Sequence, residues 1–300
     1  MLPPVVAGVD GSSESLAAAA WAAREAVRRE RPLRLVHAWN RHPHRRDGEI
    51  ASAAQRHLAR RVLRRAEEHV RATCPDVRLY DEQVEGPATG ALLKAAERAD
   101  LLVLGSRGLS GFTGFLVGSV ALGTAAKAKR PVLLVRAGED EADEHLPAAD
   151  GSASTRTRYR DVVLGIDVGD PCDEVIEFAF EAARLRHARL RAVHAWRVPG
   201  PAGLGPGEIA LVNESQRAEE WLGFLQAVLQ VWRDKYPDVE TLETVVEDRA
   251  TNVLVRAATG ASLLVVGRRI AERPFGPRLG PVTHAAIHHV GCPVAVVPHR

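Results

Sequence analysis

The feature that most constrains the fold of this chain is an internal repeat. The run Val5–Asp10 (VVAGVD) recurs 157 positions later as Val162–Asp167 (VVLGID), and Leu33–Trp39 recurs with the same offset as Leu190–Trp196, with six identities in seven positions. Two further pairs share an offset of 162, namely Leu101–Gly105 with Leu263–Gly267 and Pro131-Val132 with Pro293-Val294. Self-similarity on this scale means that one structural unit is built twice.

The repeat divides the chain into two domains, 1–140 and 158–300, joined by a linker at 141–157. The joining region is acidic at Glu139-Asp140-Glu141 and rich in small hydroxyl side chains at Ser152–Thr155. Such a segment cannot bury enough apolar surface to order itself, so we expect a linker there.

Within each copy, short β-branched runs alternate with Ala-, Leu-, Glu- and Arg-rich stretches of helical length, which is typical of βαβ units around a parallel sheet. In the first copy the pattern predicts strands near 4–9, 33–38, 77–84, 101–105 and 132–136, and helices near 13–30, 52–73, 88–99 and 118–129. Continuously apolar strands such as Leu101–Leu104 indicate helices on both faces of the sheet. Ligands of such sheets bind at the carboxyl ends of the strands.

The amino-acid composition limits the kinds of partner that this chain is expected to bind. Hydrophobic residues make up 46%, charged residues 26%, and the formal net charge is only +2, which gives little reason to expect nucleic acid or an acidic membrane as a partner. No apolar run reaches the roughly 20 residues needed to span a bilayer, and the N-terminus lacks the features of a signal peptide. Three separated cysteines suit thiols in a reducing compartment. We expect a cytoplasmic protein.

A glycine-rich segment follows the fourth predicted strand. Gly105, Gly108, Gly118 and Ser119 form the pattern Gly-x2-Gly-x9-Gly-Ser, with the last two opening a helix. Glycines let the main chain approach a ligand closely, and free amides at a glycine turn and a helix start attract anions. Ser119 adds a hydroxyl and Arg107 a positive charge, so a polyphosphate would fit. The pattern is neither a Walker A motif nor a dinucleotide fingerprint; the alternative is a tight turn without a ligand.

Together with Gly8-Val9-Asp10-Gly11-Ser12 and His37-Ala38, this pattern resembles the universal stress protein family, ATP-binding type. The resemblance covers both copies. It implies an α/β fold of two tandem Rossmann-like (adenine nucleotide α-hydrolase-like) domains, each with a five-stranded parallel sheet flanked by helices. It also implies binding of ATP, with Mg²⁺ as an optional companion, and a role in stress response or regulation. The implied binding residues are Gly8, Val9, Asp10, Ala38, Leu104, Gly105, Arg107, Gly108, Gly118, Ser119 and Val120.

Alternatives remain for both site and function. Asp10, which the resemblance implies beside the ribose, phosphates or metal, could instead be a helix-capping aspartate. No catalytic residue and no resident metal ligand is assigned, because no general base, Walker lysine or nucleophile constellation accompanies the loop. The alternatives to a regulatory ATP-binding protein are a slow ATPase or adenine-nucleotide hydrolase, and a nucleotide-free dimerisation or interaction module.

The second copy departs from this pattern. At the shared offset, Ile270 replaces Gly108 and Pro281 replaces Ser119. Asp170 brings a carboxylate near the expected phosphate position, where Arg268, Arg269 and Arg273 oppose it. We therefore expect the second copy to bind ATP weakly or not at all.

The last apolar strands of the copies, 132–135 and 294–297, would lie at sheet edges according to the resemblance. Unprotected apolar edges usually find a partner. We expect the two copies to pack together as an intramolecular pseudo-dimer, or whole chains to form a homodimer, with a signalling partner that the sequence does not identify.

Overall fold

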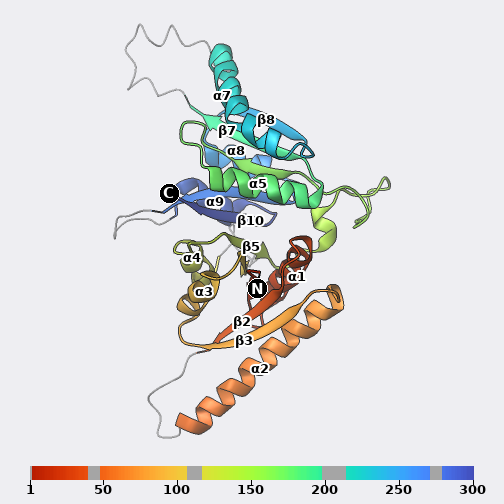
Figure 1. Cartoon of the computed structure of the whole chain (residues 1–300), viewed down its shortest axis with the longest axis vertical. Coiled ribbons are helices and arrows are strands. Elements are labelled where there is room, and N and C mark those ends of the chain that lie inside the picture. Colours follow the sequence, from red (N-terminus) through yellow and green to blue (C-terminus); the bar gives the residue numbers. More distant parts are fainter. Residues whose placement is uncertain (1, 40–47, 107–116, 198–213, 271–278) are drawn as a thin grey trace.

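The computed structural model describes residues 2–39, 48–106, 117–197, 214–270 and 279–300. They form one ten-stranded sheet with helices on both faces, in the order β3-β2-β1-β4-β5-β10-β9-β6-β7-β8. The first copy occupies the lower half of Figure 1 and the second copy the upper half. The predicted α/β fold with two tandem, five-stranded parallel units is confirmed, and the two units share a single sheet.

The strands of the first copy are β1 (Val5–Gly8), β2 (Leu33–Trp39), β3 (Leu79–Glu85), β4 (Leu101–Ser106) and β5 (Val132–Arg136). Its helices are α1 (Ser13–Arg28), α2 (Gly48–Thr73), α3 (Ala88–Ala96) and α4 (Ser119–Ala125). The strands of the second copy are β6 (Val162–Gly165), β7 (Leu190–Trp196), β8 (Thr241–Glu247), β9 (Leu263–Arg269) and β10 (Val294–His299). Its helices are α5 (Asp173–Arg186), α7 (Glu214–Lys235), α8 (Ala250–Ala257) and α9 (Pro281–His289).

The two halves of the sheet meet at β5 and β10. These strands pair antiparallel, with Leu133 opposite Ala295, whereas the strands within each copy pair in parallel. Each copy thus covers the apolar edge strand of the other, as the sequence predicted for an intramolecular pseudo-dimer. Nothing in this pairing requires a second chain.

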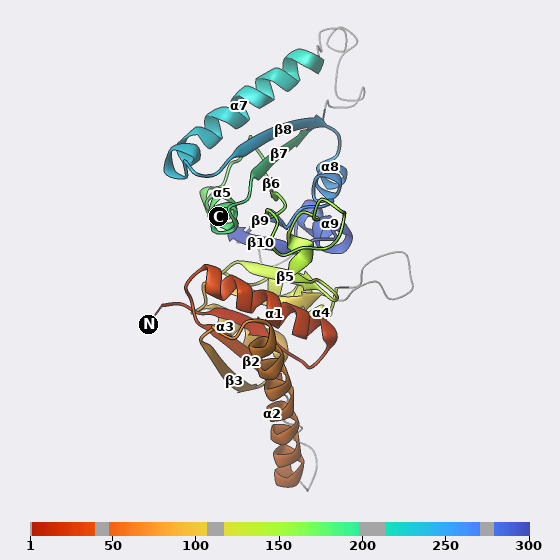
Figure 2. The same ribbon diagram turned by 90° about the vertical axis from the view of Figure 1, so that its right-hand side faces the viewer.

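Two hydrophobic cores cover the two faces of the sheet, and each runs through both copies. Val5 and Ala7 belong to the core under α1, α2, α5 and α7, while Val6 belongs to the core under α3, α4, α8 and α9. The alternation follows from the period of two along a strand. Figure 2 shows these helices on both sides of the sheet. The packing of buried side chains therefore continues across the β5–β10 joint from one copy to the other.

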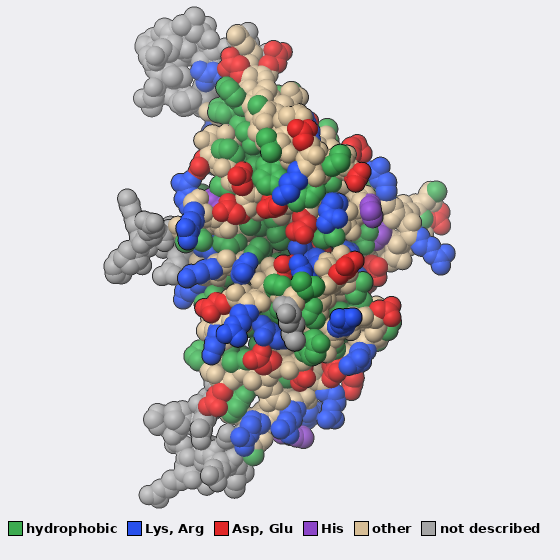
Figure 3. Space-filling model, in the orientation of Figure 1, with side chains coloured by type: hydrophobic (Ala, Val, Ile, Leu, Met, Phe, Trp, Pro, Cys, Tyr) green, Lys and Arg blue, Asp and Glu red, His purple; other side chains and the backbone are tan. Residues whose placement is uncertain are grey.

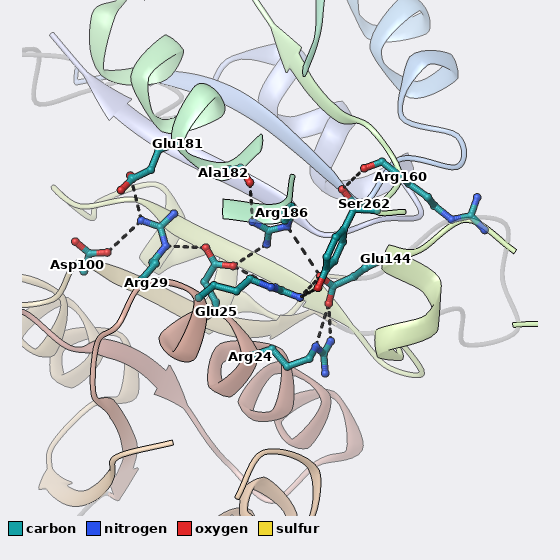
Figure 4. A network of polar contacts seen from close by, with 12 residues as sticks. Arg24, Glu25, Arg29, Asp100, Glu144, Arg160, Glu181, Ala182, Arg186 and Ser262 are labelled. Atoms are coloured by element: carbon teal, nitrogen blue, oxygen red, sulfur yellow. Dashed lines mark hydrogen bonds and ion pairs between the residues drawn. The ribbon is translucent and has the colours of Figure 1, made fainter. Parts of the chain in front are cut away.

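A buried ionic network reinforces the joint (Figure 4). Glu25 of α1 accepts hydrogen bonds from Arg29 at 2.6 Å and from Arg186 of α5 at 2.7 Å. Arg29 also reaches Glu181 of α5 at 3.3 Å and lies 5.2 Å from the Phe178 ring. Arginine forms such multiple planar contacts better than lysine does.

The connecting segment between the copies takes part in this network. It contains a short 3₁₀ helix, η1 (Glu141–Glu144), and Glu144 has no solvent exposure. The Glu144 carboxylate accepts from Arg24 at 2.7 Å and from Arg28 at 2.9 Å. The expectation that composition leaves this segment without order was therefore wrong at Glu144, because two arginines of α1 provide the partners that a buried carboxylate requires.

The pKa values at the joint follow its charges. Burial alone would raise the pKa of the Glu144 carboxyl, but Arg28 and Arg24 outweigh burial and hold that pKa below its usual range. Glu139, a few residues earlier, has no comparable compensation: burial, Asp143 and Glu144 raise its pKa to about 8. The joint therefore contains one stabilised carboxylate and one carboxyl that favours its protonated form.

The outer surface has mixed charge. On the face shown in Figure 3, basic and acidic side chains are interspersed over both copies, in keeping with the net charge of +2. Within the described part of the chain, no helix combines the length and the hydrophobicity needed to cross a membrane.

Candidate functional site

A cavity lies at the carboxyl ends of β1, β2 and β4, where parallel sheets of this kind bind ligands. Its volume is about 280 Å³. Its lining includes nine of the eleven residues predicted for the site: Gly8, Val9, Asp10, Ala38, Leu104, Gly105, Gly118, Ser119 and Val120. The other two, Arg107 and Gly108, lie outside the described residues. The structure thus brings together side chains from three strand ends and from the start of α4.

Asp10 is held at this cavity by the turn into α1. Its carboxylate accepts the Ser12 backbone N–H at 3.0 Å and the Ser12 hydroxyl at 2.5 Å. Partial burial would raise the pKa of Asp10, but the hydrogen bonds from Ser12 outweigh burial and the pKa is lowered. Ser12, and not Asp10, is the N-cap of α1, since its side chain accepts the Ser15 N–H. Asp10 therefore supports the cap while its exposed carboxylate stays ionised beside the cavity.

The glycines of the site have different reasons to be glycine. A Cβ on Gly105 would lie 2.6 Å from backbone atoms of Glu14, so the fold itself requires glycine where β4 passes the start of α1. A Cβ on Gly118 would meet nothing within 4 Å, and its φ of −62° is open to any residue. The packing of the described residues does not explain Gly118, whereas close approach of a ligand would.

Residues outside the predicted set complete the cavity: Ser12, Glu14, Ser15, Val36, Ala88, Leu92 and Ala121. Leu92 lies on the buried face of α3 and borders the space beside Gly8. Its place one helical turn after Ala88 indicates a buried helix face, but only the packing of α3 over β1 places that face at the cavity. No motif would have selected these residues.

The second copy has its own cavity, of about 340 Å³, at the ends of β6, β7 and β9. Asp167, Ala195 and Gly267 occupy the positions of Asp10, Ala38 and Gly105. His194 and its counterpart His37 also match: each places Nδ1 beside the carbonyl that ends the first strand, Ile166 at 3.1 Å and Val9 at 2.7 Å. The scaffold of the site is therefore preserved in both copies.

After β9, the fourth strand of the second copy, the backbone stays extended. In the second copy β9 runs to Arg269, paired with His299, and the Ile270 N–H donates to the His299 carbonyl at 2.7 Å. In the first copy the residues that follow Ser106 of β4 lie outside the described part of the chain. Ile270 thus continues an extended pairing at the position of Gly108, a conformation that suits a β-branched residue.

The first helix also starts later in the second copy. α5 begins at Asp173 with Cys172 as its N-cap, three aligned positions after the start of α1. Pro171 precedes that cap, and the residue before a proline is biased away from the helical region. The Cys172 Sγ lies 2.9 Å from Nδ1 of His299, so part of the space at this helix start is filled by the C-terminal end of β10.

Asp170 forms an ion pair with Arg269, as the predicted opposition of charges suggested. Arg269 aligns with Arg107, so the cation at this position of the second copy already has a carboxylate partner. Arg268 does not face Asp170, contrary to the prediction: it donates to the carbonyls of Ala126 and Ala128 in the first copy. Side chains alternate along a strand, so Arg268 and Arg269 leave β9 on opposite sides. Arg273 is outside the described residues.

Metal binding has little support within the described segments. They hold no group of three or more His, Cys, Asp or Glu side chains with the geometry to bind a metal ion. His284 and His288 lie on one face of α9, with ring centroids 4.3 Å apart.

The fold and the cavities define a class: tandem α/β proteins with a pair of cavities at the carboxyl ends of parallel strands. The family model described as "Universal stress protein family" matches residues 1–136 and 158–298, and the chain belongs to this family. Universal stress protein Rv2005c of Mycobacterium tuberculosis is 30% identical over 304 residues, covering 97% of this chain and 96% of that protein. Universal stress protein Rv1996 of the same organism is 30% identical over 314 residues, covering 97% and 94%.

Solved structures support the fold. A universal stress protein from Archaeoglobus fulgidus superposes with a TM-score of 0.70 at 17% identity, covering 98% of both chains. A second structure, from Pseudomonas aeruginosa and described as a putative universal stress protein, has a TM-score of 0.58 at 15% identity and covers 99% of this chain and 94% of that one. Both similarities span the two copies, so the tandem arrangement has structural precedent.

Proposed function

We propose that the chain is a regulatory ATP-binding protein in which the first copy, 1–140, binds the nucleotide. The observation that carries this proposal is the cavity at the ends of β1, β2 and β4, which gathers the exposed Asp10 carboxylate and the Ser119 hydroxyl at the start of α4. Its volume, about 280 Å³, is close to the lower end of the range of roughly 300–1,000 Å³ for small-molecule sites.

The residues present suit the separate parts of ATP. Val36, Leu92 and Leu104 give the cavity an apolar wall for the base. The Asp10 carboxylate can accept ribose hydroxyls or bind Mg²⁺, which would neutralise phosphate charge when bound. Ser119 and the first-turn amide groups of α4 can donate to phosphate oxygens, because these N–H groups have no partner inside the helix.

Within the same proposal the second copy, 158–300, binds ATP weakly or not at all. Pro281 removes the hydroxyl and the amide hydrogen that Ser119 offers. Asp170 adds a negative charge and pairs with Arg269. The Thr283 hydroxyl at the start of α9 is already donated to the Gly267 carbonyl at 2.9 Å. The changes at Pro281 and Asp170 therefore reduce the attraction for phosphate, and the Thr283 hydroxyl, already donated, does not replace that of Ser119.

A matched pair of variants tests the assignment. Asp10→Ala and Asp167→Ala remove the same exposed carboxylate from the first and the second cavity. In ATP titrations of the full chain by calorimetry, Asp10→Ala is expected to weaken binding about tenfold or more, as loss of a charged hydrogen bond does. Asp167→Ala should stay within about twofold of the unaltered chain. Equal effects of the two substitutions, or no ATP binding by the unaltered chain, would refute the proposal.

A further inference from the structure

The second copy keeps an open cavity although we propose that it binds ATP weakly or not at all, so its ligand has still to be assigned. This cavity is larger than the first, about 340 Å³ against about 280 Å³. Ile166, Val193 and Leu254 line it with apolar surface at the strand ends. An apolar cavity with a few polar groups is the usual form of a small-molecule site. If the second copy had only a scaffolding role, packing would be expected to close this space.

Two polar groups of this cavity call for hydrogen-bond donors from a ligand. The Asp167 carboxylate is exposed and accepts the Gly169 N–H at 3.1 Å, but Gly169 has no hydroxyl to match that of Ser12 in the first copy. Nδ1 of His194 lies 3.1 Å from the Ile166 carbonyl oxygen and 3.4 Å from the Val168 backbone nitrogen, and we assign the hydrogen to Nδ1 from the shorter of these contacts. Its Nε2 is then an acceptor, and among the described residues this buried atom has no hydrogen-bond partner. An unmet buried acceptor is costly.

The charges at this cavity disfavour an anion. Asp167 and Asp170 line it, and among the described residues the only arginine in its lining, Arg269, is paired with Asp170. Asp173 and Glu174 do not line the cavity, but they follow its lining residue Cys172 in the first turn of α5. Phosphate groups would meet net negative charge, whereas hydroxyl groups would meet acceptors.

We propose that the second cavity binds a neutral nucleoside, with its flat ring against Val193 and Leu254 and its sugar hydroxyls donating to Asp167. The apolar wall suits an aromatic ring, and a carboxylate suits the two adjacent hydroxyls of a ribose. His194 supplies a further acceptor for an amino or hydroxyl group. The site is distinct from the proposed ATP site and does not depend on it.

The test uses adenosine and AMP as probes, which differ only in one phosphate, with the full chain. Leu92→Trp places a larger side chain in the first cavity, and Leu254→Trp does the same at the aligned position of the second cavity. Circular dichroism and thermal unfolding check that both variants fold. In calorimetry, Leu92→Trp is expected to bind one adenosine per chain, with AMP at least tenfold weaker, and Leu254→Trp to lose this adenosine site. No adenosine binding by Leu92→Trp, or AMP binding as tight as adenosine, would overturn the inference.

Exposed substitutions keep the test decisive if a tryptophan disrupts folding. In the Asp10→Ala background, Asp167→Asn is expected to weaken adenosine binding about tenfold, and Asp170→Ser, which frees Arg269, to strengthen AMP binding severalfold. Unchanged adenosine affinity in Asp167→Asn would reject the site. The proposed ATP function is tested separately, by ATP binding to Leu254→Trp, so failure of one hypothesis does not imply failure of the other.

Discussion

The two cavities of this chain have the same scaffold and different polar chemistry. Asp10 and Asp167, Gly105 and Gly267, and His37 and His194 occupy equivalent places. At the phosphate side the first copy offers Ser119, whereas the second offers Pro281 and an arginine already paired with Asp170. A repeat can therefore keep its fold while a few side chains change which charge its cavity accepts.

Even the shared glycines differ in what constrains them. Gly105 packs against the backbone of α1, while a Cβ on Gly267 would meet the flexible side chain of His299. A Cβ on Gly118 or on Gly280 would meet no described residue within 4 Å, so the glycine before the last helix does not distinguish the copies. The distinction rests on the residues that follow these glycines and on the later start of α5.

The largest expected effect comes from breaking the joint. Glu144→Ala leaves Arg24 and Arg28 without their buried partner, and such a loss costs about 3–5 kcal/mol in the free energy of unfolding. Urea unfolding measures it, with exposed Glu97→Ala as the control near zero. ATP stoichiometry, measured where the variant is folded, should not change, since Glu144 lines neither cavity. A changed stoichiometry would show that the cavities cannot be compared independently of the joint.

A smaller effect is expected from adding one methyl group to each copy. Gly105→Ala places a Cβ 2.6–2.8 Å from backbone atoms of Glu14 and Ser15, and overpacking of this kind costs about 2–3 kcal/mol. Gly267→Ala meets only side chains, which can move, so about 1 kcal/mol or less is expected. Urea midpoints of the two variants measure the difference. Equal destabilisation would contradict the difference between the copies at these glycines.

The smallest expected effect is a change in how the free energy of unfolding depends on pH. It comes from Glu139 at the joint, which lines neither cavity. Glu139 has a pKa of about 8 in the folded chain against an ordinary value of 4.5. Because the pKa of Glu139 is higher in the folded chain than in the unfolded chain, its contribution to the free energy of unfolding is fully present below pH 4.5. That contribution is lost as the pH rises through 8. Glu139→Gln should remove this loss and stabilise the chain by about 1–2 kcal/mol at pH 9, with little change at pH 4.5.

Urea unfolding of Glu139→Gln at pH 4.5, 7 and 9 checks that prediction. Acid destabilisation should persist in the variant, because Arg28 and Arg24 hold the pKa of Glu144 below its usual range and that carboxylate loses its contribution only as the pH falls. If the stability of Glu139→Gln fell as much as that of the unaltered chain between pH 7 and 9, Glu139 would not be the group whose ionisation causes this loss of stability.

The sequence predicted the features that depend on local pattern. The repeat indicated two equivalent units, and apolar runs indicated strands covered on both faces. The apolar edge strands 132–135 and 294–297 indicated that the two copies pack together, and the structure shows that they do so by pairing β5 with β10. The predicted binding residues that the structure describes line one cavity, because the carboxyl ends of β1, β2 and β4 meet at the same edge of the sheet.

Features that depend on distant side chains could not be predicted. Glu144 lies in a segment whose composition suggests a linker, yet its partner Arg24 is 120 positions away. The contact of Cys172 with His299 spans 127 positions. Neither pair has a periodicity or motif, and each depends on how α1 and β10 are placed by the shared sheet.

The most direct test of the difference between the cavities is the number of ATP molecules bound per full chain at saturation, measured by equilibrium dialysis. The prediction is one ATP per chain, lost in Asp10→Ala/Ser119→Ala and retained in Asp167→Ala. Two ATP molecules of similar affinity per chain, or one that is lost with Asp167 and retained without Asp10, would contradict the assignment of ATP to the first copy.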